Sequence, residues 1–383
     1  MNKKLKIAVV HPFFRPKEGA SLVMAKIADH FHADVYCIEY NKEKTFESLK
    51  KNKVTVIPTL PFPSSRFFDG IKAGFSFYTY NLPEEYDAII ASTSPSEWIR
   101  NRNSPVIWYC HSPNKEVYSH YEKRMKRKNI VSKIFYFTAA NIFRLLENTV
   151  INKIEYIFAN SNLTKQRIKI YLNRDSEILY PVFTKGLFRN ISYQKYFFYP
   201  SRIAPDKRFE YAIEAFKQFK KKGKEKVKDW KLIIAGSLES QYTDYYKKLV
   251  EMIKDRDDIE IKLNVPQPEL VKLYGNAFCI LFTPIEEDFG MVPLEGFESE
   301  KPCIAVNEGG AKETIEDGKD GFLVNSSTEM VDKMFYLVSN PSIAIKMGKN
   351  GKKKLRQKFS EEHFYKRIEE VVEELKEKRN IKQ

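Results

Sequence analysis

The chain has 383 residues, of which 43% are hydrophobic and 30% are charged. This length is more than one hydrophobic core usually serves, so two domains are expected, and the composition is that of a globular protein. No apolar run is long enough to span a bilayer, and the four cysteines show neither the paired spacing of a metal site nor a disulfide framework. We therefore expect a cytoplasmic protein.

The net charge of +15 is unevenly distributed along the chain. Residues 1–190 contain 30 Lys and Arg against 17 Asp and Glu, whereas residues 191–383 contain 35 against 33. A basic half suits an acidic partner or an anionic membrane face, although a lysine-rich composition alone produces the same imbalance. A helix in which cations precede an apolar, aromatic run suits a membrane interface. Such a run contains Lys123, Arg124, Lys126, Arg127, Lys128 and Lys133, followed by Ile134, Phe135 and Phe137.

Short apolar runs alternate with helical patterns, which predicts a parallel α/β architecture. The start of the chain is basic and then apolar, but an apolar run of about five residues is too short for a signal peptide, so we interpret it as the first strand. A helix is expected from Ala20, where Val23, Ile27 and Phe31 recur at four-residue spacing. The further strands of this first domain, residues 1–190, are DVYCIEY, VTVIP, DAIIAS, PVIWYC and EYIFANS.

The pattern becomes irregular near residues 182–198 and then restarts, which predicts a second domain over residues 191–360. The strands of this domain are FFYP, KLIIAG, IEIKL, FCILFTP, PCIAV and FLV. A last helix over residues 361–383 carries a single apolar stripe that needs a partner, and we expect it to pack back on the first domain. The stripe is made of Phe364, Ile368, Val371 and Leu375.

Candidate site residues follow the strand FCILFTP. Gly290 precedes a helical run with Val292 and Pro293 in its first turn, so unpaired N–H groups would form an anion site at the strand tip. Glu287 lies in the preceding loop, and Glu295 lies one turn into the helix. A carboxylate beside a phosphate is repulsive unless it accepts hydrogen bonds from neutral hydroxyls, which indicates a ligand such as a nucleotide-sugar. Acidic residues near helix starts are also common for electrostatic reasons alone.

Other strand tips present further candidates. PCIAV is followed by Gly309 and Gly310, where the backbone could approach a ligand closely. FFYP is followed by Arg202 and Lys207, two cations that could clamp a diphosphate. A solvated turn is the alternative for this pair, but its strand is expected in the same sheet as FCILFTP.

The first domain offers two candidates. His111 ends the strand PVIWYC, and a histidine at a strand tip is a suitable polar group for a reacting centre. A structural histidine is an equal alternative. Gly19 precedes the first helix and would permit another close backbone approach, which by itself is a weak signal.

Three patterns belong to other functional classes. Asp255 and Asp257 have the spacing of a metal-binding carboxylate pair, but they lie in the charged loop KDRDDIE, so we expect no metal site there. Residues 220–228 are strongly basic but lack interleaved aromatics, which predicts the end of a surface helix and no nucleic-acid partner. The G-x-G-x-x-G and P-loop motifs are absent, which disfavours dinucleotide oxidoreductases and NTPases.

The segments SRIAPDKR, EEDFGMVPLE and GGAKE together resemble the donor-binding half of the family 4 glycosyltransferases, which are retaining enzymes of the GT-B fold. The resemblance in order and spacing covers nearly the whole chain and includes His111, Asn160-Ser161, Tyr180-Pro181, Arg202 and Lys207. It implies two facing Rossmann-like domains, with the donor bound mainly by the second and the acceptor by the first. It also implies a C-terminal crossover helix and no metal or other cofactor.

The resemblance assigns roles by matching position. Arg202 and Lys207 would hold the donor diphosphate, Glu287 the sugar hydroxyls and Glu295 the ribose, and His111 would approach the donor sugar. The remaining donor-binding positions are Gly19, Phe289, Gly290, Met291, Val292, Gly309 and Gly310.

Within the family, CHSP beside EEDFG-x-VP-x-E and P-x-KR is most similar to mannosyltransferases that use GDP-mannose. The chain departs from the family at Glu18-Gly19-Ala20, where a paired glycine is usual, and at KLNVPQ, which lacks the glycine often found beside the base. The expected function is transfer of a hexose, most readily mannose, from a nucleoside-diphosphate sugar to a glycan or lipid-linked acceptor. The alternatives are a GT-B-shaped epimerase or phosphorylase and a non-catalytic polyanion-binding protein.

Overall fold

The computed structural model divides the chain into two compact units, each built on one parallel sheet. Unit 1 contains Met1–Val182 and Glu361–Gln383, and unit 2 contains Phe183–Ser360. Two residues named from the sequence, Glu18 and Arg127, lie outside the part of the chain that the structure describes. The described residues are 5–14, 19–43, 45–60, 66–126, 128–183 and 185–382, without the side chains of 66–68 and 382.

The sheet of unit 1 has seven strands in the order β3-β2-β1-β4-β5-β6-β7. They are β1 (Ile7–Val10), β2 (Asp34–Cys37), β3 (Val54–Val56), β4 (Ala88–Ala91), β5 (Val106–Cys110), β6 (Tyr156–Ala159) and β7 (Glu177–Ile178). The first six lie where the apolar runs predicted them. The sequence analysis missed β7, because two residues are too few to show a strand pattern.

Helices cover both faces of this sheet, as parallel strands require. In β1, Ile7 and Val9 belong to one buried cluster, whereas Ala8 and Val10 belong to another on the opposite face. The helices are α1 (Gly19–Phe31), α2 (Arg66–Thr79), α3 (Tyr121–Lys126), α4 (Ile130–Ile151), α5 (Asn162–Leu172) and α13 (Glu361–Lys382), with the 3-10 turns η1 (Glu47–Lys51) and η2 (Ser96–Asn101).

The C-terminal helix α13 belongs to unit 1. Its apolar stripe lies in the same buried cluster as Ile7 and Val9 of β1. Arg367 on its polar side binds the carboxylate of Glu177 at 2.8 Å, which ties the helix to β7. The stripe consists of Phe364, Ile368, Val371, Val372 and Leu375.

The boundary between the units falls after Val182, whereas the sequence analysis placed it after residue 190. The segment that follows Val182 is held by unit 2. Phe188 packs against Tyr274 with ring centroids 4.8 Å apart, and the N–H of Gly186 donates to Glu298 at 3.0 Å. Irregular backbone carries no periodic pattern, so the sequence could not show which unit this segment joins.

The sheet of unit 2 has six strands in the order β10-β9-β8-β11-β12-β13. They are β8 (Tyr196–Pro200), β9 (Lys231–Gly236), β10 (Ile259–Leu263), β11 (Cys279–Phe282), β12 (Cys303–Val306) and β13 (Gly321–Val324), all at predicted positions. The α-helices are α6 (Phe209–Gly223), α7 (Thr243–Ile253), α8 (Gln267–Asn276), α9 (Met291–Glu298), α10 (Ala311–Thr314), α11 (Ser327–Ser339) and α12 (Pro341–Lys358). The 3-10 turns are η3 (Pro205–Lys207), η4 (Lys224–Val227) and η5 (Ser240–Tyr242).

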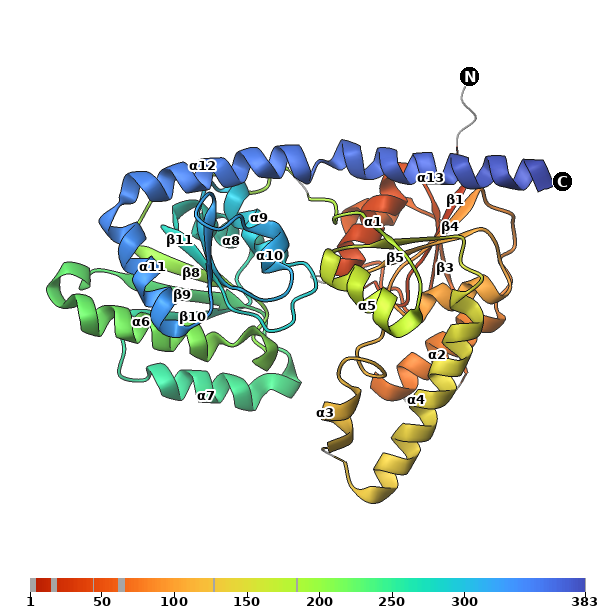
Figure 1. Cartoon of the computed structure of the whole chain (residues 1–383), viewed down its shortest axis with the longest axis horizontal. Helices are drawn as coiled ribbons and strands as arrows, with labels where there is room; N and C mark the ends of the chain where they lie inside the picture. Colours follow the sequence, from red (N-terminus) through yellow and green to blue (C-terminus); the bar gives the residue numbers. More distant parts are fainter. Residues whose placement is uncertain are drawn as a thin grey trace. The chain divides into compact units, whose positions relative to one another are not determined.

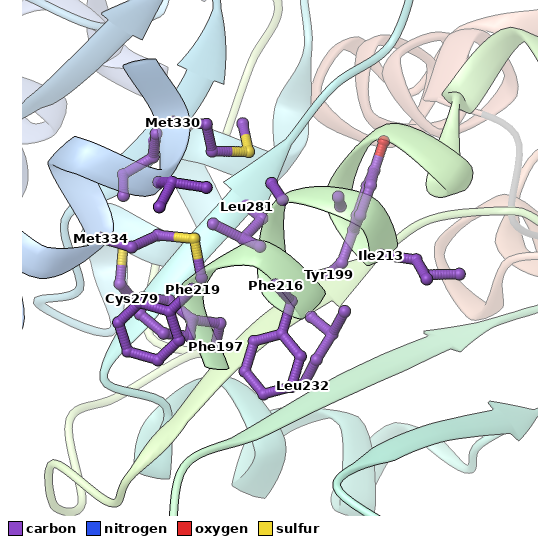
Figure 2. Close-up of a cluster of buried hydrophobic side chains, with 14 of the residues drawn as sticks. Phe197, Tyr199, Ile213, Phe216, Phe219, Leu232, Cys279, Leu281, Met330 and Met334 are labelled. Atoms are coloured by element: carbon purple, nitrogen blue, oxygen red, sulfur yellow. The ribbon is translucent and has the colours of Figure 1, made fainter. Parts of the chain in front are cut away.

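The core of unit 2 is rich in aromatic rings. Phe197 of β8 packs edge-on against Phe219 of α6 at 5.4 Å and against Phe216 at 6.3 Å. Figure 2 shows these rings with Tyr199, whose hydroxyl points away from the hydrocarbon cluster. A buried tyrosine needs a partner for its hydroxyl, and that partner lies at the strand tips. Tyr199 therefore connects the hydrophobic core to the sheet edge where the candidate residues lie.

Several other expectations are confirmed. Cys37, Cys110, Cys279 and Cys303 are buried in strands, and none forms a disulfide. Residues 220–228 include the end of α6, although Lys220 is not simply solvated, because its ammonium lies 3.2 Å from Asp258. Among the helices in the described ranges, none is both long and apolar enough to cross a membrane.

Candidate functional site

The loops after β8 and β11 are joined at the point where the strand order of unit 2 reverses. These strands are neighbours, so both loops leave the same edge of the sheet, which is where doubly wound sheets bind ligands. The N–H of Ile285 donates to the carbonyl of Asp206 at 2.8 Å. The N–H of Thr283 donates to the hydroxyl of Tyr199 at 3.1 Å, and that hydroxyl donates to the carbonyl of Lys207. Backbone bonds therefore fix the two loops against each other.

Lys207 ends the turn η3, and its ammonium lies 2.6 Å from Glu287 and 3.5 Å from Asp206. Its side chain is only 14% exposed. Lys207 is therefore not a freely solvated cation, because the two carboxylates hold its ammonium against the protein. Burial opposes the charge, but Glu287 and Asp206 outweigh this effect and raise the pKa of Lys207 above its usual value.

Arg202 lies earlier in the same loop and is more open, with its side chain 40% exposed. Its guanidinium donates to Glu239 at 2.8 Å and lies 6.0 Å from the centre of the Tyr242 ring. Arginine can bind a diphosphate through two parallel hydrogen bonds. Arg202 can present that geometry from a partly solvated position, whereas Lys207 acts as a shielded point charge.

Arg208 is part of the site, and the sequence analysis did not name it. Its backbone is left-handed, with φ +51, and its guanidinium donates to the carbonyl of Thr283 at 2.8 Å and of Pro284 at 3.3 Å. It also lies 3.2 Å from the carboxylate of Glu308. Arg208 therefore links three strand-tip loops. The KR pair in the motif was visible in the sequence, but only the fold shows that the second cation points into the loops.

The helix after β11 begins as predicted, with Gly290 as its N-terminal cap and Met291 as its first residue. Gly290 has φ +84, and a β-carbon there would lie 3.0 Å from the ring of Phe282. Both features require glycine. Phe289 is buried against Phe359, while Met291 and Val292 are partly exposed. The first N–H groups of α9 therefore point toward the edge that carries Arg202 and Lys207.

Glu295 lies one turn into α9, as predicted, and accepts a hydrogen bond from the hydroxyl of Tyr274 on α8. Burial raises the pKa of Glu295 to about 7, and the bond from Tyr274 opposes this rise. Glu287 and Glu295 are therefore in different environments. The first is paired with an ammonium, whereas the second depends on a neutral hydroxyl.

Gly309 and Gly310 lie close to another protein loop, which requires glycine here whether or not their backbone also approaches a ligand. A β-carbon on Gly309 would lie 2.4 Å from the carbonyl oxygen of Glu287, and one on Gly310 would lie 2.2 Å from that of Phe289. The N–H of Gly310 also donates to the carbonyl of Glu287 at 2.8 Å. The glycines therefore position the loop that carries Glu287.

His111 of unit 1 directly follows β5, and its carbonyl accepts a hydrogen bond from the hydroxyl of Thr164 at 3.1 Å. Its Nε2 atom is buried and has no hydrogen-bond partner among the described residues. Burial lowers the pKa of His111 to about 4, so the ring is neutral at pH 7. A neutral ring nitrogen with unused hydrogen-bonding capacity suits contact with a sugar hydroxyl.

A second histidine, His11, directly follows β1 and was not predicted as a site residue from the sequence. Its ring nitrogens lie 2.6 Å from the hydroxyl of Ser92 and 3.0 Å from that of Ser21. Its position after an apolar strand was the same signal that led to His111. Gly19 begins α1, and a β-carbon there would meet nothing within 4 Å among the described residues, so none of these residues requires glycine at this position.

Asp255 and Asp257 lie in the loop between α7 and β10, as expected. Within the part of the chain that the structure describes, no group of three or more His, Cys, Asp and Glu side chains could hold a metal ion. Arg202, Lys207 and Arg208 are the cationic side chains described above at the strand tips of unit 2.

Comparisons with known proteins identify similar sequences and structures. Residues 189–354 match the family model described as glycosyl transferases group 1. The alpha-1,3/1,6-mannosyltransferase ALG2 of Dictyostelium discoideum is 28% identical over 432 aligned residues, which cover 97% of this chain and 99% of the relative. The ALG2 enzyme of Homo sapiens is 25% identical, over 76% of this chain and 74% of its own length.

Among solved structures, Anabaena Alr3699/HepE in complex with UDP and glucose matches with a TM-score of 0.74 and 19% identity, over 97% of this chain and all of that one. The chain is a glycosyltransferase of the GT-B fold. The resemblance to family 4 glycosyltransferases noted from the motifs is thereby confirmed. The roles assigned to individual residues of this glycosyltransferase remain predictions, because neither the comparisons nor the geometry tests them.

Proposed function

We propose that this glycosyltransferase transfers mannose from GDP-mannose to a glycan on a lipid carrier. The observation that carries the proposal is the match to ALG2 mannosyltransferases over nearly the full length of both chains. The motif CHSP beside the two-glutamate motif supports the same donor. The site suits such a donor, because it combines cations for a diphosphate with carboxylates for hydroxyl groups.

The reaction breaks the bond between the anomeric carbon and the diphosphate oxygen and forms a bond from that carbon to the acceptor hydroxyl. Negative charge therefore develops on the leaving diphosphate. Arg202 and Lys207 stabilise this charge in place of a metal ion, and preorganised charges of this kind contribute several kcal/mol, on the order of 3 each. The acceptor attacks from the face that the diphosphate leaves, and a phosphate oxygen takes the proton of the hydroxyl. This route retains the anomeric configuration without a covalent nucleophile.

The carboxylate of Glu287 accepts hydrogen bonds from hydroxyls of the donor sugar, and that of Glu295 accepts them from the ribose. Nε2 of His111 is suited to a sugar hydroxyl of a substrate, since it is otherwise unpartnered among the described residues. A neutral imidazole is suitable for this contact, because it can donate or accept one hydrogen bond without adding charge.

The proposal includes attachment of unit 1 to an anionic membrane, where a lipid-linked acceptor is found. Helix α4 carries large apolar side chains that are 54% to 76% exposed, and we call this surface the α4 ridge. It consists of Ile130, Val131, Ile134, Phe135, Phe137, Ile142 and Leu145. Soluble surfaces seldom gather so many large apolar side chains, and Figure 1 shows α3 and the first half of α4 extending away from the sheet of unit 1.

Basic side chains flank the α4 ridge. Lys123 and Lys126 lie on α3 and Lys128 lies in the connection to α4, whereas Arg127 is outside the described residues. Arg124 binds Glu116 at 2.7 Å and is therefore less available to a lipid headgroup. Exposed apolar residues beside cations suit a helix that lies in the membrane interface.

The donor can be tested by measuring thermal stabilisation of the full chain by GDP-mannose, UDP-glucose, GDP and UDP. Hydrolysis of the bound donor is then measured with and without a lipid-linked mannosyl acceptor. We expect GDP-mannose to stabilise most and the acceptor to accelerate its consumption, with full activity in EDTA. Phosphorolysis or epimerisation of the sugar without transfer, or binding of polyanions alone, would contradict the proposal. A requirement for Mn²⁺ would make Asp255 and Asp257 candidates for a metal site.

A further inference from the structure

The hydroxyl of Tyr274 is the hydrogen-bond donor to the carboxylate of Glu295, and it comes from a different element of unit 2. Tyr274 lies on α8, which precedes β11, whereas Glu295 lies on α9, which follows it. The tyrosine side chain is fully buried. The bond therefore forms inside the protein, behind the carboxylate.

Two aromatic rings hold Tyr274 in place. Phe198 of β8 packs perpendicular to it at 5.1 Å, and Phe188 of the segment that opens unit 2 packs at 4.8 Å. A ring fixed on both sides cannot turn its hydroxyl away without disrupting this packing. The direction of the bond to Glu295 is therefore set by the core.

The surroundings of Glu295 oppose its ionisation. Burial is the main effect on its pKa, which rises to about 7, and the bond from Tyr274 is the effect that lowers it. Cys303 of β12 also faces the tyrosine hydroxyl, but burial raises the pKa of its thiol well above the usual value, so it stays uncharged. Among the described titratable groups of unit 2, Tyr274 is thus the one that contacts the carboxylate of Glu295. Its hydrogen bond favours the ionised form of Glu295.

We propose that Tyr274 is a positioning residue for the nucleoside part of the donor, because it orients Glu295 and keeps it ionised to receive the ribose hydroxyls. The inference rests on the proposed function, which assigns the ribose to Glu295. An ionised carboxylate accepts hydrogen bonds more strongly than a protonated one. Tyr274 itself touches no substrate and acts only through the carboxylate.

The test is the affinity for GDP, measured by calorimetry between pH 6 and pH 9 for wild type and Tyr274→Phe. Affinity of the wild type should decline as pH falls through about 7, where Glu295 takes up a proton. Without the tyrosine hydroxyl, the decline should begin about one pH unit higher, with an affinity at pH 7 lower by about fivefold and largely restored at pH 9. A general structural role would lower affinity equally at every pH and would overturn the proposal.

Tyr196→Phe is a matched control. The hydroxyl of Tyr196 donates to the carbonyl of Leu273 at 2.7 Å, and Leu273 is the residue before Tyr274 on α8. Its pH profile should equal that of the wild type. Glu295→Gln provides a second test if Tyr274→Phe fails to fold, because its GDP affinity should vary over this pH range only as the GDP phosphate itself titrates. If it varies as in the wild type, Glu295 is not the titrating group and the proposal is wrong. Wild-type protein that binds none of GDP, UDP and ADP would overturn the proposed function, whereas an unchanged profile with intact binding would overturn the role of Tyr274 alone.

Discussion

The ammonium of Lys207 lies 2.6 Å from the carboxylate of Glu287, and the two side chains come from the loops after β8 and β11. They are 14% and 25% exposed, so each charge is partly shielded from water and balances the other. The proposed function assigns one residue to the diphosphate and the other to the sugar. A donor would thus meet a preformed ion pair, and replacing either residue alters the charge around the other.

Lys207→Ala should lower turnover at saturating GDP-mannose by about 100-fold or more, because a fixed cation no longer faces the leaving diphosphate. It should also destabilise unit 2 by about 1–3 kcal/mol, since the partly buried Glu287 loses its partner. Turnover and denaturant unfolding are measured on the same samples. Lys222→Ala is the control, because Lys222 forms a comparable 2.8 Å pair with Asp332 at a side-chain exposure of 63%. Near wild-type turnover in Lys207→Ala would refute the assignment.

Glu287→Gln and Glu295→Gln should separate sugar binding from nucleoside binding. Glu287→Gln should weaken GDP-mannose by about tenfold and spare GDP, because its carboxylate meets only the sugar. Glu295→Gln should weaken both ligands by similar factors at pH 8, since both contain the ribose. Dissociation constants for the two ligands decide the matter. Equal losses for both ligands in both variants would show that the division of roles is wrong.

Replacing Ile134, Phe135 and Phe137 of the α4 ridge with Ser should weaken sedimentation with anionic vesicles while donor hydrolysis in solution persists. Replacing the basic residues with Gln should also weaken sedimentation with the vesicles, most strongly at low salt, since each cation near an anionic membrane contributes about 1 kcal/mol. These residues are Lys123, Arg124, Lys126, Arg127 and Lys128. Ile170→Ser, which removes an exposed apolar side chain from α5, serves as the control. Wild-type protein that does not sediment with anionic vesicles at either low or moderate salt would refute the membrane proposal.

His11 should make stability fall as the pH is lowered. Burial lowers its pKa to about 3, with repulsion from His111 adding to the effect, whereas its usual value is 6.5. Between these values the unfolded chain holds a proton that the folded chain lacks, so unfolding takes up a proton and stability is lost as pH decreases. From pH 6.5 to 4.5 the wild type should lose about 2–3 kcal/mol more than His11→Gln.

Burial raises the pKa values of Glu147 and Glu295, so these two groups act in the opposite direction over this range. Both are present in the wild type and the variant, so their contribution cancels in the comparison. Free energies of unfolding from urea titrations at the two pH values provide the measurement. Parallel losses in the two proteins would mean that His11 does not titrate as inferred.

Most of the strand framework was predictable, because buried parallel strands appear in a sequence as short apolar runs bounded by Pro, Gly or charged residues. The gathering of Arg202, Lys207 and Glu287 at one edge followed from the same runs. Their pairing did not follow, because Lys207 and Glu287 are 80 residues apart and their contact depends on how β8 aligns with β11. The sequence shows which side chains reach an edge but not which neutralise each other.

Tyr274, Arg208 and His11 were missed for a common reason. The sequence around each residue indicates only that it is buried or charged. Its hydrogen-bond partners come from other elements of the fold, which the sequence does not show. The packing role of the glycine pair was not predicted for a related reason. A glycine permits close approach by any group, and only the structure shows that the approaching group at Gly309 and Gly310 is the loop that carries Glu287.

The assignment of α13 to unit 1 has a consequence for the order in which the chain is completed during synthesis. Unit 2 ends at Ser360, so every residue of its core is made before Phe364, Ile368 and Val371 reach the cluster around β1. The unit that is begun first on the ribosome is thus finished last, and until then one face of its sheet has the cover of α1 without that of α13. A chain that stops at Ser360 should keep unit 2 resistant to proteases while unit 1 is cleaved, and equal resistance of both units would show that α13 is dispensable.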